Sequence, residues 1–418
     1  MVVMNTNPHP PLFGEVGIIA LVPDRWGPYW QARHQIATRL ARYFQVVWVD
    51  CPPTWQKSFR WSSWRSPVWQ PAETPAGFQI YRTGPWSPNL GRPAWLRHRF
   101  SRERLENARR LLRDRGCSKI VLYLWRPEFA DSIDLVDHHL SCYHIDDEYS
   151  FSPSERELDA TEVRLIRAVD QVFIHSPAMM EKKGTLNPHT QFVPNGVDYQ
   201  NYITPMPEPA DLGSIPKPRI GYTGNLKRML DWRLLLQLST MHPEWSFVLV
   251  GSMLPHLEVR EVSRELSRRQ NVYIVGPRPS ELIPSYVQHF DVCIMPYKVD
   301  DYTKYIYPLK LHEYLAGGNP VVGSSIPALQ EFKEEVLLAD GSDEWSSMIA
   351  RALSGQENTV ERRTTRQLVA AGFDWDLLVE KLAGTLAHRL GLPLPDTVKC
   401  GNQDLNDSAV SVARLAPR

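Results

Sequence analysis

The sequence predicts an α/β protein of two Rossmann-like domains, each with a doubly wound parallel sheet, that face one another across a cleft. Three observations lead to this prediction. Short apolar runs rich in Val and Ile alternate with helical segments, which is typical of parallel βαβ units. A proline-rich stretch interrupts the alternation near the middle of the 418-residue chain. The alternation then restarts, so two halves of similar size are expected.

The first half, residues 14–204, is expected to be an acceptor-binding Rossmann-like domain. Its predicted strands are residues 16–22, 45–49, 119–124, 140–145, 171–175 and 191–194. Its predicted helices are residues 29–44, 102–115, 154–169 and 177–183. Ligands of such sheets bind beyond the carboxyl ends of the strands, so we look for functional side chains there.

The stretch 205–218 is predicted to be a linker, because its five prolines cannot continue a helix or a central strand. Residues 219–372 form the second expected domain, with strands at 219–223, 246–250, 272–275 and 291–295. Residues 373–391 read as an amphipathic terminal helix that could cross back to the first domain. Residues 392–418 are polar and are expected to be disordered.

Composition limits the classes of protein to consider. Apolar residues make up 43% and charged residues 22% of the chain, as in ordinary globular proteins. The formal net charge is zero, which argues against a nucleic-acid partner. Five scattered cysteines without metal-like spacing predict free thiols in a reducing compartment. No apolar run is long enough to span a membrane, so we expect a cytoplasmic protein, with contact to the inner face of the membrane left open.

The segment that follows the strand at 291–295 predicts an anion-binding helix. Pro308 is favoured at a first helical position, and Gly317-Gly318 ends the helix. Its unpaired N–H groups and positive dipole would face the crevice above the sheet. Lys310 in the first turn and Glu313 on the same face suit a sugar diphosphate. The alternative is a surface helix with a weakly stabilising Lys–Glu pair.

Further candidates for donor binding follow other strands of the second half. Gly224-Asn225 ends the strand at 219–223, and Lys227 or Arg228 could neutralise a phosphate. Arg278 follows the strand at 272–275. The alternative is that the glycines serve turns and the cations are solvated. The chain has no G-x-G-x-x-G after the first strand and no P-loop, which disfavours nicotinamide dehydrogenases and P-loop ATPases.

Three acids in a row, Asp146, Asp147 and Glu148, directly follow the strand at 140–145. A carboxylate at this point could take a proton from an acceptor hydroxyl, and Asp146 is the predicted catalytic residue, with Asp147 on the acceptor side. The alternative is that the acids cap the next helix. His34, at the start of the first helix, could contact a hydroxyl on the acceptor side or could be structural.

Residues 55–104 combine six Trp with nine Lys and Arg against two Glu. Trp with Arg suits a membrane interface or a lipid-linked acceptor. Base stacking and a poorly packed insertion are the alternatives, and nucleic acid is the least favoured.

The chain resembles the GT-B glycosyltransferases, in particular the glycosyltransferase-4 type enzymes of bacterial exopolysaccharide and cell-wall synthesis. The most specific part of the resemblance is residues 291–329, which contain Pro308-Leu309-Lys310 and Glu313. Residues 219–252 and 192–199 support it. The resemblance implies a nucleotide-sugar donor held mainly by the second domain, with no bound metal and no cofactor. It also implies that Glu313 contacts the donor, that Lys310 neutralises the diphosphate, and that Asp146 lies near the catalytic carboxylate of related glucuronosyl-type enzymes.

One position departs from the family pattern of two Glu separated by seven residues. The first of these positions is Tyr305, which leaves the donor sugar and the retaining or inverting outcome open. Tyr305 and Tyr307 could contact the sugar or the base, beside Pro308 and Leu309.

The predicted function is that of a metal-independent hexosyltransferase acting on a glycan or lipid-linked acceptor in surface polysaccharide synthesis. The alternatives are a sugar-nucleotide epimerase of the same fold and a non-catalytic nucleotide-sugar-binding protein.

Overall fold

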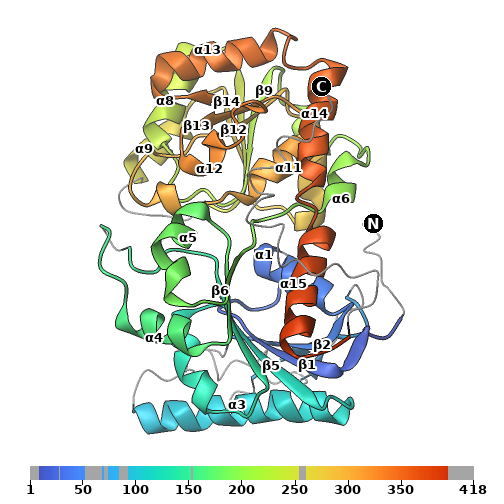
Figure 1. Cartoon of the computed structure of the whole chain (residues 1–418). Coiled ribbons are helices and arrows are strands. Elements are labelled where there is room, and N and C mark those ends of the chain that lie inside the picture. Colours follow the sequence, from blue (N-terminus) through green and yellow to red (C-terminus); the bar gives the residue numbers. More distant parts are fainter. Residues whose placement is uncertain are drawn as a thin grey trace, which may run out of the picture. The chain divides into compact units, whose positions relative to one another are not determined.

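A computed structural model describes residues 9–27, 29–51, 68–69, 74–83, 93–151, 154–253 and 260–393 of the chain. The chain divides into two compact units (Figure 1). The first unit runs to Val193 and takes up the chain again from Asp376, and the second unit is Pro194–Trp375. The proline-rich stretch 205–218 lies inside the second unit and contains the short helix α7 (Ala210–Gly213).

The first unit is built on an eight-stranded sheet with the order β3-β4-β2-β1-β5-β6-β7-β8. Its strands are β1 (Phe13–Leu21), β2 (Phe44–Val49), β3 (Val68–Trp69), β4 (Phe78–Tyr81), β5 (Lys119–Leu124), β6 (Leu140–Ile145), β7 (Gln171–Ile174) and β8 (Thr190–Phe192). All neighbours pair in parallel except β3, which lies antiparallel to β4. The order reverses at β1, so the predicted doubly wound parallel sheet is confirmed.

The strands of this sheet are apolar because both faces are covered. From Val16 to the end of β1 every residue is buried, and such continuous apolar runs are typical of parallel sheets covered by helices. A Cβ at Gly17 would lie 2.8 Å from Leu112 Cδ1. Glycine at this position therefore lets helix α3 (Ala94–Asp114) pack directly against β1.

The second unit is built on a six-stranded parallel sheet with the order β11-β10-β9-β12-β13-β14. Its strands are β9 (Arg219–Thr223), β10 (Ser246–Val250), β11 (Val272–Gly276), β12 (Val292–Met295), β13 (Val321–Ser324) and β14 (Val336–Ala339). Its helices are α6 (Tyr199–Ile203), α7, α8 (Trp232–Met241), α9 (Arg260–Leu266), α10 (Ile283–Gln288), α11 (Leu309–Gly317), α12 (Pro327–Gln330), α13 (Gly341–Leu353) and α14 (Val360–Ala371). Here the strand order reverses between β9 and β12.

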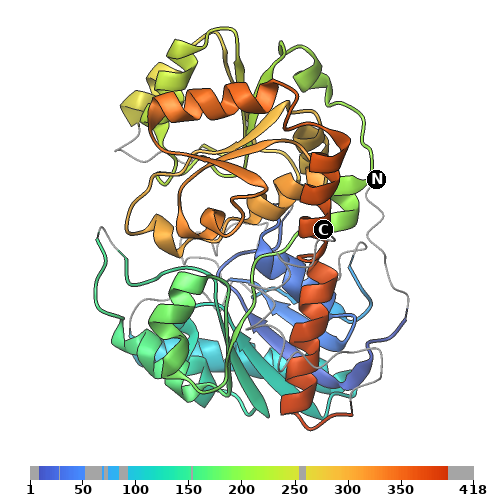
Figure 2. The same ribbon diagram turned by 45° about the horizontal axis from the view of Figure 1, so that its top comes forward.

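Helices cover both faces of the second sheet. Helix α8 packs with α9 and α13, while α11 packs with α10 and α14 (Figure 2). The second unit therefore also has the predicted doubly wound arrangement, with apolar residues of the strands buried between two helical layers.

Several helices of the first unit begin or end away from their predicted bounds. Helix α1 (Ala32–Leu40) is shorter than predicted, and α3 begins before the predicted residue 102. Helix α4 (Ala160–Ala168) begins after the predicted residue 154, because Asp159 provides its cap by accepting hydrogen bonds from the amides of Thr161 and Glu162. Helix α5 (Pro177–Lys183) has its predicted bounds.

The last described helix, α15 (Trp375–Arg389), packs in the first unit from Asp376 onward. It runs beside β1 and β2 in both views (Figures 1 and 2). Asp376 pairs with Arg39 at 2.6 Å and with Arg42 at 2.9 Å, and Lys119 Nζ donates to the carbonyl of Leu390 at 2.8 Å. Polar contacts therefore fasten both ends of this segment to the first unit.

Some predictions fall outside the described residues. These are the tail beyond residue 393 and most of the Trp-rich stretch, including Trp55, Trp61, Trp64 and Trp86. Among the residues that are described, no helix combines the length and the apolar character needed to cross a membrane.

We predict that Gly221→Ala lowers the free energy of unfolding by about 1–3 kcal/mol, the usual cost of overpacking a core. A Cβ at Gly221, in the middle of β9, would lie 2.1 Å from the ring of Phe290. The measurement is urea denaturation followed by intrinsic fluorescence. The matched control is Gly213→Ala, where no atom lies within 4 Å of the added methyl group. Equal stability of the two variants would contradict this account of β9.

Candidate active site

The candidate site of the second unit lies where its strand order reverses. The carboxyl ends of β9 and β12 are neighbours in the sheet, and ligands of such sheets bind at this point. One loop leaves β9 at Gly224. Another leaves β12 and enters α11 at Leu309. The segments that the sequence singled out separately therefore meet at one edge of the sheet.

The side chain of Lys310 folds over the loop that follows β9. A Cβ at Gly224 would lie 2.6 Å from Lys310 Nζ, and Gly224 has φ of +124°. Both facts require glycine at this position, since other residues rarely adopt such a φ and would also meet the ammonium group. The structure thus brings together two residues that were predicted to bind the donor.

Three side chains surround the Lys310 ammonium. It lies 4.9 Å from the centre of the Tyr222 ring, within the range of a cation–π contact, and it is hydrogen-bonded with Tyr297. Burial raises the pKa of Tyr297, while Lys310 acts in the opposite direction. Because the phenol stays neutral, it can orient the ammonium without cancelling its charge.

Glu313 is partly exposed and belongs to the same polar group. Burial raises the pKa of its carboxyl, and Lys310 and a hydrogen bond from Tyr202 act to lower it. Tyr202 is itself buried, on α6. A carboxylate held in this way can accept hydrogen bonds from the hydroxyls of a sugar.

Helix α11 is fixed in its middle and at its carboxyl end by residues that the sequence did not indicate. Tyr314 accepts a hydrogen bond from the Thr223 amide at 2.8 Å, which ties the helix to the last residue of β9. At the carboxyl end, Arg366 Nε donates to the carbonyl of Gly318 at 3.1 Å. Both anchors depend on contacts between distant parts of the sequence, so no local pattern could reveal them.

Some predicted donor-binding residues have other partners. Arg278 pairs with Asp211 at 2.6 Å and donates to Tyr286 at 3.0 Å. The Tyr307 hydroxyl is buried and hydrogen-bonded with His312 at 3.1 Å. Both side chains are therefore engaged with other groups of the second unit.

The remaining donor-side residues lie around α11 or in the loop after β9. Pro308 caps α11 in an extended conformation and Leu309 is the first helical residue, so the prediction of Pro308 as the first position was wrong by one residue. Tyr305 is buried, with Lys304 4.8 Å from its ring centre. In the loop after β9, the following residues are at least partly exposed: Asn225, Lys227 and Arg228. Arg228 lies 5.8 Å from the ring centre of Tyr302.

In the first unit, Asp146 follows β6 and is held by two partners. Its Oδ2 lies 2.8 Å from an Arg33 nitrogen, and its Oδ1 accepts from the Tyr149 hydroxyl at 2.6 Å. Arg33 also pairs with Asp24 at 2.6 Å. Arg33 therefore joins the loop after β1 to the loop after β6, a role that the sequence did not indicate.

The two acids after Asp146 are engaged locally. Asp147 accepts a hydrogen bond from the Glu148 amide at 2.8 Å. Glu148 is buried, 3.2 Å from Lys183 Nζ, and accepts from the Ser150 hydroxyl. The alternative that one of these acids caps the next helix is wrong, because Asp159 caps α4.

A buried ionic cluster stabilises the loop that carries Asp146. Lys183 Nζ lies 2.8 Å from Glu162 as well as near Glu148, and all three side chains are fully buried. Burial raises the pKa of Glu162 and Lys183 opposes this. The net effect of Lys183 and Ser150 lowers the pKa of Glu148 despite its burial. Two carboxyl groups thus share one ammonium.

His34 points into the core, where the sequence left open whether it contacts an acceptor. It is 2% exposed and packs against Trp26 and Trp48 with ring centroids 5.3 and 4.7 Å away. Its Nδ1 accepts from the Gln31 amide. Burial, and secondarily Arg33, lower its pKa to about 3. His34 is therefore a neutral core residue.

No group of three or more His, Cys, Asp or Glu residues is placed to hold a metal ion in the part of the chain that the structure describes. The described cysteines, Cys51, Cys117, Cys142 and Cys293, are free thiols.

Solved structures define the class of fold. The chain is similar to HepE of Anabaena in complex with UDP and glucose, with a TM-score of 0.63 and 16% identity over 90% of this chain and 99% of that one. It is also similar to an α,α-trehalose-phosphate synthase (UDP-forming) of Burkholderia vietnamiensis, with a TM-score of 0.62 and 12% identity over 91% and 100% of the chains. The chain has the GT-B fold of glycosyltransferases.

Sequence comparison points to the same class of protein. Residues 217–355 match the family model described as "Glycosyl transferases group 1". Over 238 residues the chain is 29% identical to the "Putative teichuronic acid biosynthesis glycosyltransferase TuaH" of Bacillus subtilis (strain 168), covering 54% of this chain and 58% of that protein. It is also 29% identical over 179 residues to the "D-inositol 3-phosphate glycosyltransferase" of Corynebacterium urealyticum, covering 39% of this chain and 41% of that protein. The chain thus spans about half the length of these relatives, and the predicted resemblance to GT-B glycosyltransferases is confirmed.

We predict that His34→Phe weakens the loss of stability on acidification. Unfolded His has a pKa near 6.5 and folded His34 one of about 3, so the unfolded chain binds the extra proton between these values and stability falls as the pH drops below about 6.5. Between pH 7 and pH 5 the contribution of His34 lowers the free energy of unfolding by about 2 kcal/mol. Urea denaturation at both values measures it.

The control is His189→Phe, because His189 is exposed and its replacement leaves the buried His34 in place. His144 and His312 also have pKa values lowered to about 3 by burial, so part of the pH dependence remains in every variant. An unchanged difference between the two pH values in His34→Phe would contradict the neutral state of His34.

Proposed function

We propose that the chain transfers a sugar from a nucleotide-sugar donor to a glycan or lipid-linked acceptor in surface polysaccharide synthesis, without a bound metal. The observation that carries the proposal is the meeting of Lys310, Gly224 and the amino end of α11 at the edge of the second sheet. Helix N–H groups, a glycine that allows close approach and a positioned cation together suit a diphosphate.

In the proposed reaction the bond between the anomeric carbon and the diphosphate oxygen breaks, and an acceptor oxygen forms a new bond to that carbon. The nucleoside diphosphate leaves with the electron pair, and Lys310 with the amino end of α11 stabilises its charge. Glu313 holds donor hydroxyls. Asp146 receives the proton of the acceptor hydroxyl, and Arg33, 2.8 Å away, orients Asp146.

A non-catalytic nucleotide-sugar-binding protein is the second candidate. It is favoured by Tyr305, which is 6% exposed and offers no carboxylate where the family pattern has its first Glu. Thermal-shift measurements with UDP, GDP and dTDP, followed by transfer assays with the matching sugars and membrane extract, separate the two. Stabilisation by a diphosphate together with sugar transfer supports the enzyme. Stabilisation without transfer supports the binding protein, and no stabilisation by any nucleotide contradicts both.

We also propose that the protein works on the cytoplasmic side of the membrane. Its support is the set of free thiols on the described residues, which suits a reducing compartment.

We predict that Lys310→Met weakens binding of the nucleoside diphosphate that the screen selects by about 10- to 100-fold. The physical reason is the loss of a charge-assisted hydrogen bond, worth about 1.5–3 kcal/mol. Isothermal titration calorimetry measures the change. Lys333→Met removes an exposed lysine of the same unit and should bind like the unmodified protein. Equal affinity of the two variants would remove Lys310 from the donor site.

We predict that Asp146→Asn lowers turnover by about 10²- to 10⁴-fold, the usual contribution of a general base, and leaves donor affinity nearly unchanged. Asp147→Asn is the matched variant, since Asp147 is the next residue along the chain and accepts a hydrogen bond from the Glu148 amide. Steady-state kinetics at saturating donor and calorimetry with the nucleotide give the two quantities. Unchanged turnover in Asp146→Asn would exclude the residue as base, and a larger loss in Asp147→Asn would transfer the role.

A further inference from the structure

The loop after β6 holds the carboxylate of its first acid, Asp146, from two sides. Arg33 of α1 lies 2.8 Å from Oδ2, and the Tyr149 hydroxyl donates to Oδ1 at 2.6 Å. The second distance is typical of a hydroxyl that donates to a carboxylate. A donor on each oxygen fixes the rotation of the carboxylate about its Cβ–Cγ bond and leaves each oxygen with one open lone pair.

The rotation of this carboxylate matters because little of Asp146 can be reached from outside. Its side chain is 10% exposed, so an acceptor hydroxyl can approach it from only a narrow range of directions. A rotated carboxylate would turn its open lone pairs toward the protein. Misplacement of a reacting group by about 1 Å can cost about 100-fold in rate. A residue that sets the rotation therefore affects proton transfer even if it takes no proton itself.

Tyr149 has further partners that fix its hydroxyl and its ring. The hydroxyl also lies 3.2 Å from the carbonyl of Trp125, the first residue after β5, and its single proton favours the shorter contact with the charged acceptor. The Arg126 guanidinium lies 4.8 Å from the ring centre and Lys183 Nζ lies 5.8 Å from it, within the range of cation–π contacts. Tyr149 thus connects Asp146 to the end of β5, the strand that pairs with β6.

The Tyr149 hydroxyl keeps its own proton. Burial and, after it, the charge of Asp146 raise the pKa of this phenol well above its usual range. At neutral pH the hydroxyl therefore donates to Asp146 and does not compete for the proton that the proposed reaction transfers.

The backbone between Asp146 and Tyr149 is held independently of the Tyr149 hydroxyl. Glu148 lies 3.2 Å from Lys183 of α5, and both side chains are fully buried. The Ser150 amide donates to Glu148 Oε1 at 3.0 Å. Loss of the hydroxyl alone should therefore free the Asp146 carboxylate rather than unfold the loop.

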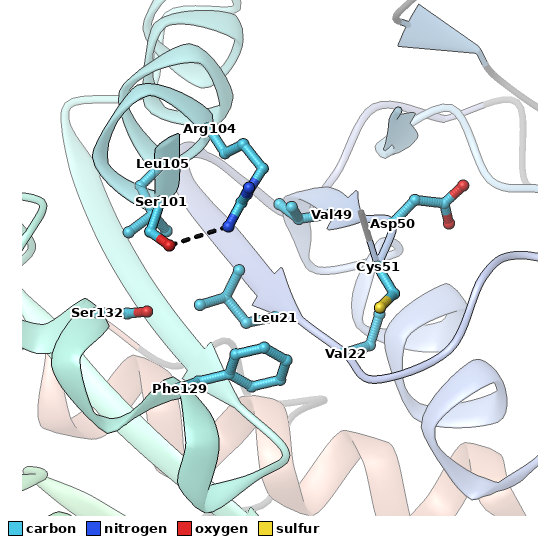
Figure 3. A pocket seen from close by; sticks show the side chains of 10 residues that line it. All are labelled: Leu21, Val22, Val49, Asp50, Cys51, Ser101, Arg104, Leu105, Phe129 and Ser132. Atoms are coloured by element: carbon cyan, nitrogen blue, oxygen red, sulfur yellow. Dashed lines mark hydrogen bonds between the residues drawn. The ribbon is translucent and has the colours of Figure 1, made fainter. Parts of the chain in front are cut away.

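Another carboxylate at the same edge of the first sheet is held differently. Asp50 directly follows β2 beside a small hollow near the ends of β1 and β2, and its carboxylate points away from that hollow (Figure 3). Its Oδ1 accepts from the Trp26 amide at 2.9 Å and from Trp48 Nε1 at 3.0 Å. The two indole rings pack against each other with centroids 5.3 Å apart. Packed tryptophans thus place Asp50, whereas a tyrosine hydroxyl holds one oxygen of Asp146.

We propose that Tyr149 is a positioning residue for the proposed base, because its hydroxyl holds the Asp146 carboxylate in the rotation that presents an open lone pair to the acceptor hydroxyl. The inference rests on the proposed function, since it deepens the role assigned there to Asp146. The acceptor proton goes to Asp146, the acceptor oxygen bonds to the anomeric carbon, and the nucleoside diphosphate leaves with the electron pair. The Tyr149 proton stays on Tyr149 throughout.

We predict that Tyr149→Phe lowers the rate of sugar transfer about 10- to 100-fold and leaves the affinity for the nucleoside diphosphate unchanged. The variant removes one hydroxyl, so the carboxylate loses its fixed rotation while the donor site in the second unit stays intact. Rates are measured on the full-length chain at saturating donor, with the nucleotide sugar that the screen selects and membrane extract as the source of acceptor. Calorimetry with the nucleoside diphosphate gives the affinity.

The matched control is Tyr81→Phe, which removes another tyrosine hydroxyl of the first unit. Tyr81 is buried, and its hydroxyl accepts from Asn107 Nδ2 at 3.1 Å. This variant should transfer sugar at the unmodified rate.

A double-mutant cycle separates positioning from a general loss of structure. In the Asp146→Asn background, where no base is left to orient, Tyr149→Phe should lower the rate by less than about twofold. A merely structural effect would keep its full size in that background. Incorporation of 4-aminophenylalanine at position 149, which keeps a donor at the same place, should restore most of the rate.

Circular dichroism during thermal unfolding shows whether each variant folds. If Tyr149→Phe does not fold, 4-fluorophenylalanine at position 149 replaces it in the same comparison, because fluorine fills the space of the hydroxyl and donates no hydrogen bond. An unchanged rate in a folded variant without the hydroxyl, or an equal loss in the Asp146→Asn background, would overturn the proposal.

The same measurements distinguish failure of the proposed function from failure of the role of Tyr149. If the unmodified protein transfers no sugar, the proposed function fails and the role of Tyr149 falls with it. If Asp146→Asn is as fast as the unmodified protein, Asp146 is not the base and Tyr149 has nothing to position. If Asp146→Asn is slow and Tyr149→Phe is normal, only the role of Tyr149 is wrong.

Discussion

The candidate donor site depends on one hydrogen bond, in which the Thr223 amide donates to the Tyr314 hydroxyl at 2.8 Å. A strand amide at the end of β9 would otherwise be left without a partner in the core, at a cost of about 1–3 kcal/mol. Satisfying it with a side chain of α11 fixes the rotation of that helix. Given this rotation, Lys310, four residues earlier, lies on the same face of α11 as Tyr314, and Glu313 is the residue directly before Tyr314.

The fold could be predicted because buried parallel strands are apolar along their whole length. Gly224 and Lys310 could be singled out as candidates because both follow strands that adjoin the reversal of strand order. Pairings between distant residues gave no local signal. Asp211 pairs with Arg278 from a distant part of the chain, and Arg33 reaches Asp146 from another loop. The sequence also could not show whether the His34 side chain points into the core or to the surface, because either is possible at the start of a helix.

The two units show how one topology can present opposite charges at the same edge. In the second unit a cation, Lys310, lies close to the loop backbone after the first strand of the sheet. In the first unit the edge beyond β6 carries acids that have cationic partners: Asp146 has Arg33, and Glu148 has Lys182 and Lys183, the second of which it shares with Glu162 of α4. A buried carboxylate without such a partner would cost several kcal/mol, so these cations are what allow a negative loop to be buried here.

Charge balance also indicates how the donor site tolerates Tyr305 in place of a Glu. Lys310 and Glu313 together are neutral when both are ionised, so their sum offers no attraction to a diphosphate. A second carboxylate at position 305 would make the site net negative and would oppose anion binding. Tyr305 is buried and uncharged. The amino end of α11 is equivalent to roughly half a positive charge, and the loop after β9 adds the partly exposed Lys227 and Arg228. This edge of the sheet is therefore net positive. In the proposed reaction the carboxylate that remains for donor hydroxyls is Glu313, which is hydrogen-bonded with Tyr202.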